Sequence, residues 1–143
     1  MSETVQERNK AIVRKIYEVG FNAGDALVFE ALYAPNFRHH NKTIHDVSAG
    51  GAGEAESMRR FRDAIPDARF TIEDQIAEGD RVANRLSVRG TPVKTFPPIE
   101  PTGEEMEFRA VAIFRIVDGL VAEEWFYREP TDSKPGPESA TRE

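Results

Sequence analysis

The sequence contains no cysteine, only three histidines and no long apolar run. Without cysteine the chain can form neither a disulfide, nor a thiolate metal site, nor a cysteine nucleophile. Any chemistry must therefore use oxygen or imidazole groups. No apolar stretch approaches the roughly 20 residues that cross a bilayer, and the polar N-terminus MSETVQERNK lacks the basic start and apolar stretch of a signal peptide. We expect a cytoplasmic protein with no membrane partner.

The sequence also has fewer basic than acidic residues, 19 against 25, which gives a formal net charge of −6. Phosphate binding needs a basic surface, so this composition argues against nucleic acid as a partner. A chain of 143 residues can bury one core but hardly two. We expect a single domain over residues 1–129. The segment 130–143, PTDSKPGPESATRE, has almost nothing to bury and is predicted to be disordered.

Two helices and a short strand are predicted in the first 45 residues. Thr4 and Glu7 have the spacing of a capping box, and apolar residues then recur on one helical face until Gly24. Asp25 is a candidate cap for a second, shorter helix that ends before Pro35. The histidine-containing stretch that follows is predicted to be a strand.

Three closely spaced glycines predict a flexible loop before a third helix: Gly50, Gly51 and Gly53. In that helix apolar residues recur at three-residue spacing, at Ala55, Met58 and Phe61. His45 precedes the glycines, and we expect this segment and the glycine loop to act together as a lid over a binding site.

After residue 66 the apolar period changes from three or four to two, which predicts strands. The last two strands are joined by Asp118-Gly119, a strong signal of a short hairpin. The predicted strands are residues 68–73, 82–88, 105–117 and 120–128. The proline-rich segment 95–103 is predicted to be a connection between strands. Helices followed by an antiparallel meander predict an α+β fold, in which three N-terminal helices pack on a strongly curved sheet. The resulting cone-shaped α+β barrel is a natural pocket for a small apolar molecule.

Three segments resemble the SnoaL-like polyketide cyclase family of the nuclear transport factor 2-like superfamily: IVRKIYEVGFNAGDALVFEALYAPNF, AIPDARFTIEDQIAEGDRVANR and PPIEPTGEEMEFRAVAIFRIVDGLVAEEW. The resemblance covers about residues 10 to 128. Its most specific pieces are the IPD turn, EGDRVA, the EPTG loop, and FRIVDG followed by a tryptophan on the last strand. The resemblance implies a hydrophobic small-molecule substrate, no cofactor and a homodimer packed sheet to sheet.

The resemblance does not carry over the acid/base pair of the family's cyclases. Their aspartate follows the position matched here by Trp125, which is Phe126, and their supporting histidine matches Ala112. Neither side chain can move a proton, so cyclase chemistry would need other residues. The superfamily is a scaffold for unrelated chemistries, which include isomerases, dehydratases, epoxide hydrolases and non-catalytic binders.

Alternation along the last two strands, counted from the matched family positions Ala112 and Phe126, identifies the side chains that should face the cone. This wall is apolar apart from Glu124, and it also includes Ala110, Leu120 and Ala122. Either it is a filled core or it receives a flat hydrophobic ligand. The ligand contacts expected on the second interpretation are Phe37, Met58, Phe61, Arg85, Met106, Phe108, Ala112, Phe114 and Phe126.

Glu124 is the candidate catalytic residue of this wall. If it points into an apolar cone, desolvation would raise its pKa toward neutrality, which suits a general acid/base. Glu123 should point the other way. The alternative is that the register is offset and Glu124 is solvated at the mouth.

The histidines of FRHHNKTIH are the second catalytic candidates. His39 shares a strand face with Phe37 and His40 has the opposite face, so only one of the two should line the cavity and polarise or relay. The alternative is a strand-end histidine bonded to backbone. His39, His45 and Asp46 offer the ligand types of zinc without a recognised spacing, so we predict no metal site.

Two further expectations concern the sheet. Arg85 either clamps a carboxylate or enolate oxygen of a ligand or is an exposed charge on the convex face. The outer face of the last two strands is apolar, which predicts a homodimer anchored by Trp125, or else cover by the tail. The outer residues in question are Val111, Ile113, Val121, Trp125 and Tyr127.

The first functional hypothesis is a cofactor-independent enzyme that moves a proton on a hydrophobic, carbonyl-bearing, polyketide-like substrate, with Glu124 as acid/base and His39 or His40 as its aid. Cyclisation, isomerisation and dehydration all fit this chemistry. The alternative is a binding module for a hydrophobic small molecule. Epoxide hydrolysis ranks last, because it needs two carboxylates and a basic residue and the predicted wall has one carboxylate.

Overall fold

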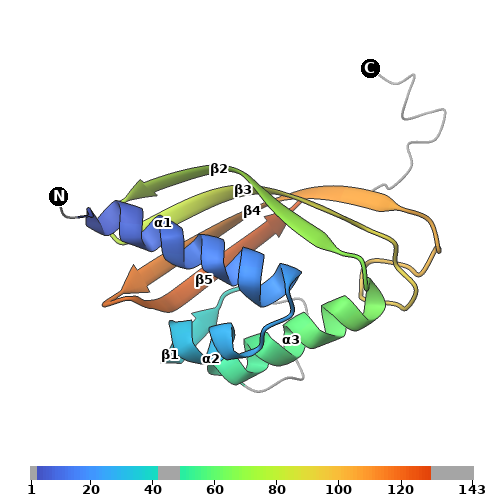
Figure 1. Cartoon of the computed structure of the whole chain (residues 1–143), viewed down its shortest axis with the longest axis horizontal. Helices are drawn as coiled ribbons and strands as arrows, with labels where there is room; N and C mark the ends of the chain where they lie inside the picture. Colours follow the sequence, from blue (N-terminus) through green and yellow to red (C-terminus); the bar gives the residue numbers. More distant parts are fainter. Residues whose placement is uncertain (1–2, 42–48, 130–143) are drawn as a thin grey trace.

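The computed structural model describes residues 3–41 and 49–129. The elements in chain order are α1 (Val5–Lys15), η1 (Ile16–Asn22), α2 (Leu27–Leu32), β1 (Tyr33–His39), α3 (Gly50–Ala64), β2 (Arg69–Glu78), β3 (Arg81–Gly90), β4 (Met106–Val117) and β5 (Leu120–Arg128). Figure 1 shows the helices on one side of a long, curled sheet. The α+β prediction is confirmed, and the sheet is curled but not closed.

The first helix begins as its sequence predicts. The Thr4 hydroxyl accepts a hydrogen bond of 3.0 Å from the Glu7 backbone N–H, and the Glu7 carboxylate accepts one of 3.2 Å from the Thr4 N–H, so the capping box is confirmed. After Lys15 the helix widens into the π-helical segment η1, which presents Tyr17 and Phe21 to the sheet side.

The glycine-rich loop prediction was wrong, because Gly50, Gly51 and Gly53 all lie in α3. The reason is packing rather than flexibility. A Cβ atom at Gly51 would lie 2.3 Å from the Phe29 carbonyl oxygen in α2, so glycine alone lets the two helices approach this closely. The other part of the predicted lid, which contains His45, falls outside the described residues, as does Asp46 of the considered zinc set.

Within the described residues the sheet has five strands in the order β1-β5-β4-β3-β2, and only β1 runs parallel to its neighbour. The hairpin between β4 and β5 turns at Asp118 and Gly119, whose φ angles of 52° and 81° are those of a tight hairpin turn. This confirms the predicted hairpin and both long strands. The proline-rich segment connects β3 to β4, as expected, and places Phe96 against the core.

A β-bulge divides β5 into two parts with opposite alternation. Arg115 pairs with Glu123 and the next residue, Ile116, pairs with Val121, so Ala122 has no partner in β4. Val121 is consequently buried at 0% exposure, although strict alternation predicted it on the outer face. Beyond the bulge the prediction is correct, because Glu124 is opposite Phe114 on the inner face.

The outer face of the sheet keeps apolar side chains exposed to solvent. Val111 is 40% exposed and Tyr127 55%, while the Trp125 ring stacks on the His40 ring at 4.5 Å between centroids. The homodimer through this face stays a prediction. In the part of the chain that the structure describes, no helix has the length and apolar character to cross a membrane.

Candidate acid–base site

A cavity of about 100 Å³ opens between the helices and the inner face of the sheet. Its walls are mostly aromatic, with Tyr17, Phe21, Phe61, Phe70, Phe96, Ile99, Phe108 and Phe126. Five polar residues complete the lining, namely His39, Glu54, Ser57, Glu124 and Arg128. A small cavity with an apolar body and few polar groups is typical of a ligand site.

Five of the predicted site residues line this cavity: His39, Phe61, Phe108, Glu124 and Phe126. Four other predicted contacts are core residues, each less than 7% exposed: Phe37, Met58, Ala112 and Phe114. Met106 is partly buried and packs against the same core. The predicted contact at Arg85 is corrected, because its side chain is exposed and its strand position pairs with Val111 of the outer face.

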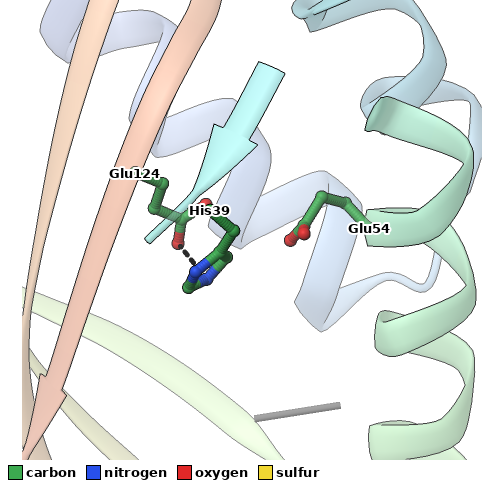
Figure 2. Close-up of side chains that lie close together, drawn as sticks. All are labelled: His39, Glu54 and Glu124. Carbon is green, nitrogen blue, oxygen red and sulfur yellow. Dashed lines mark ion pairs between the residues drawn. The ribbon is translucent and has the colours of Figure 1, made fainter. Parts of the chain in front are cut away.

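Glu124 lies in the interior, with 6% of its surface exposed. Strand β1 is paired parallel to β5 and places His39 directly beside it. The distance from His39 Nε2 to Glu124 Oε2 is 3.7 Å, and the Tyr33 hydroxyl donates a long hydrogen bond of 3.5 Å to Glu124 Oε1. Figure 2 shows the imidazole and the carboxylate facing each other.

The tyrosines near Glu124 are held in their neutral form. Burial raises the pKa of Tyr33 well above its usual value, and the nearby carboxylates Glu124 and Glu54 raise it further. The same causes, in the same order, raise the pKa of Tyr17. Tyr33 therefore acts toward Glu124 as a hydrogen-bond donor and not as a second anion.

Glu54 in α3 is a site residue that the sequence reasoning missed. It is 5% exposed, and its carboxylate points toward His39 from the helix side of the cavity in Figure 2. One ligand atom from each of His39, Glu54 and Glu124 lies within 4.8 Å of the other two. A signal existed, because Glu54, Met58 and Phe61 have the i, i+4, i+7 spacing of one helical face.

His40 belongs to the opposite side of the sheet. Its Nε2 lies 2.7 Å from Glu123 Oε1, and Arg115 donates a hydrogen bond of 2.5 Å to the other oxygen of that carboxylate. Arg115, followed by His40, lowers the pKa of Glu123. The His40 backbone N–H donates to the Glu124 carbonyl at 3.0 Å. The structure thus places His40 in the packing of β1 on β5 and His39 in the cavity.

One imidazole and two carboxylates can pass a proton among themselves and to a bound molecule. The same three groups are also the ligand types that a divalent transition metal takes. The polar Ser57 hydroxyl, buried on the same helix as Glu54, makes no hydrogen bond within residues 3–41 and 49–129. These polar side chains therefore form a cluster in a cavity whose other walls are mostly aromatic.

Comparisons with known proteins place this chain in a family. A family model described as SnoaL-like polyketide cyclase matches residues 11–131. TsrD from Streptomyces laurentii is 25% identical, with a TM-score of 0.77, over 89% of this chain and 92% of that one. AclR from Streptomyces galilaeus, a proposed hydroxylase, is 27% identical, with a TM-score of 0.72, over 87% and 90% of the two chains.

A third similar structure is IdmH from Streptomyces antibioticus, a proposed polyketide cyclase. It is 26% identical, with a TM-score of 0.71, over 85% of this chain and 91% of that one. No curated protein sequence matches the chain. The family model covers nearly all the described residues, and the protein therefore belongs to the SnoaL-like polyketide cyclase family.

Proposed function

We propose that this protein is a small-molecule enzyme that transfers protons, without a cofactor, on a hydrophobic carbonyl-bearing substrate of the polyketide type. The family and its similar structures support a cyclase- or hydroxylase-like role. The observation that carries the finer proposal is the buried His39–Glu124 pair, with Glu54 facing it across an aromatic cavity. The reaction would be a cyclisation, an isomerisation or a dehydration.

Glu124 is the proposed base. Its carboxylate would take a proton from the carbon next to the substrate carbonyl, and the electron pair would move to the carbonyl oxygen. His39 in its protonated form, or Glu54 as the neutral acid, would donate a hydrogen bond or a proton to that oxygen. The aromatic wall excludes water, which strengthens these electrostatic interactions.

Glu54 also supports a second candidate reaction, the addition of water to an epoxide. Sequence reasoning ranked it last because the predicted wall held a single carboxylate. The structure brings a second carboxylate and an imidazole to the same cavity. One carboxylate would take a proton from water while the other gives a proton to the epoxide oxygen, so the proton balance closes. Release of a diol from styrene oxide would favour this candidate.

The first experiment uses 5-nitrobenzisoxazole, an aromatic ring that opens once a base removes its carbon-bound proton. Positioned acid/base groups contribute at least about 100-fold, so we expect Glu124→Gln to lower kcat/KM by about that factor. The matched control is Glu123→Gln, which removes the neighbouring carboxylate on the outer face and should change the rate by less than about twofold.

Two outcomes would contradict the proposal. If wild-type protein opens the ring no faster than free acetate at the same concentration, the cavity holds no positioned base, and the protein is better described as a binding module. If a chelator such as EDTA abolishes the activity, the histidine and the two glutamates act as metal ligands instead of a proton-transfer set. We expect EDTA to leave the rate unchanged.

A further inference from the structure

Arg128 at the end of β5 is a cation inside the cavity wall. The central carbon of its guanidinium lies 4.9 Å from the centre of the Phe108 ring, and the side chain lines the cavity. Loss of solvent lowers the pKa of Arg128 from its usual value. Within residues 3–41 and 49–129 no acidic side chain forms an ion pair with it.

Two other arginines of this sheet lie beside carboxylates, whereas the remaining ones are exposed to solvent. Arg115 lies 2.5 Å from Glu123, and Arg89 lies 3.2 Å from Glu105. The chain has six more acidic than basic residues, so acidic side chains are abundant, yet the described residues leave Arg128 uncompensated. A partly desolvated cation is costly when no carboxylate compensates it, and a ligand carboxylate in the cavity would offset that cost.

We propose that Arg128 anchors a carboxylate on the substrate, which would be a small, flat, amphipathic acid. A guanidinium presents two parallel N–H donors that match a carboxylate. The aromatic body would lie against Phe108 and Phe126, and its reacting carbon would lie near Glu124. This inference rests on the proposed function, because it assigns the substrate class of the same site.

Strand geometry sets the length of such a substrate. Glu124, Phe126 and Arg128 alternate on one face of β5, so the Cα atoms of the first and last are about 13 Å apart along the strand. Both terminal side chains are long, and the ring of Phe126 lies between them in sequence. The space between base and anchor therefore suits roughly one ring, with the carboxylate at one end and the reactive carbonyl at the other.

The test compares trans-cinnamate with trans-cinnamamide, which have the same shape and differ in charge. We expect NMR titration of the wild-type protein to give a Kd for cinnamate at least about tenfold lower than for cinnamamide. Arg128→Gln should abolish this preference while the Kd for cinnamamide stays within about twofold. The matched control is Arg109→Gln, which removes an exposed arginine from the neighbouring strand β4 and should keep the preference.

Equal wild-type affinity for the two probes, or a preference that persists in Arg128→Gln, would overturn the proposal. If Arg128→Gln does not fold, Arg128→Lys keeps the charge, and it should retain part of the preference while losing about threefold in cinnamate affinity. The two proposals fail by separate measurements. Equal affinity for cinnamate and cinnamamide overturns the anchor whatever the ring-opening rate, and a rate no faster than free acetate overturns the proposed base whatever the affinities.

Discussion

In the described residues two histidine–glutamate pairs lie side by side on β1 and β5, and they occupy opposite faces of the sheet. His39 and Glu124 are inside, with side chains 10% and 7% exposed and 3.7 Å between nitrogen and oxygen. His40 and Glu123 are outside, 26% and 23% exposed and 2.7 Å apart. The shorter contact is thus in the more exposed pair, His40–Glu123, and not in the pair that lines the cavity.

The two pairs show that the environment decides what identical residue types can do. Arg115 is bonded to Glu123 and lowers the pKa of that carboxylate, which makes Glu123 a weaker base and fixes it as a structural anion. Glu124 has Tyr33, a neutral donor, beside it and aromatic rings around it. A carboxylate in water-poor surroundings is the more reactive base. The face, and not the sequence neighbourhood, therefore identifies the candidate catalytic pair.

Truncating one aromatic side chain on each face of the sheet should give the largest difference between the two faces, measured as the loss of unfolding free energy. Phe114 is opposite Glu124 and fully buried, whereas Tyr127 on the outer face is 55% exposed. We expect Phe114→Ala to lower the free energy of unfolding by about 3–5 kcal/mol and Tyr127→Ala by less than about 0.5 kcal/mol. Urea denaturation measures both. A similar cost at the two positions would mean that Tyr127 is covered in solution, as the predicted homodimer requires.

Replacing each histidine by glutamine should show which of the two histidine–glutamate pairs takes part in catalysis. His39→Gln should lower kcat/KM for 5-nitrobenzisoxazole opening by about tenfold and remove the histidine limb of its pH–rate profile. His40→Gln should leave the profile unchanged and the rate within about twofold. Measurement between about pH 5 and pH 9 covers the range in which imidazole titrates. Equal losses in both variants would refute the assignment of His39 as the cavity histidine.

The smallest effect is expected in the acid stability of the outer pair. The folded pKa of Glu123 lies below its ordinary value of 4.5, so its contribution to stability is present above that pH and is lost as the pH falls through the folded pKa. The difference in unfolding free energy between wild type and Glu123→Gln should therefore shrink between about pH 6 and about pH 3. A difference that is constant across this range in urea titrations would contradict the ion-pair account.

Much of the fold was predictable from the sequence because it depends on short-range patterns. The capping box at Thr4, the Asp118-Gly119 turn and period-two alternation identified the first helix and the last hairpin. Alternation counted from Ala112 and Phe126, the positions that match the family's acid/base pair, also predicted Glu124 on the inner face. The position of Val121 was not predictable, since a bulge has no clear sequence signature and reverses the alternation before it.

Parts of the site were missed for a different reason. Glu54 and Arg128 each follow the apolar period of their element, but a charged residue on an apolar face is usually assigned to solvent. Whether it points inward depends on how distant segments pack, and a one-dimensional pattern does not contain that information. For Arg85 the alternative, an exposed charge, is the one that the structure shows.

The contact between Gly51 and the Phe29 carbonyl makes the width of the cavity a property of a residue that does not line it. Helix α3 carries Glu54, and its distance from α2 is limited by the missing side chain at Gly51. A larger residue there would push α3 away from α2 and so change the position of Glu54 relative to Glu124. Ligand size is thus controlled from the helix–helix interface, so divergence or engineering of this scaffold can change substrate fit while every residue of the cavity wall stays the same.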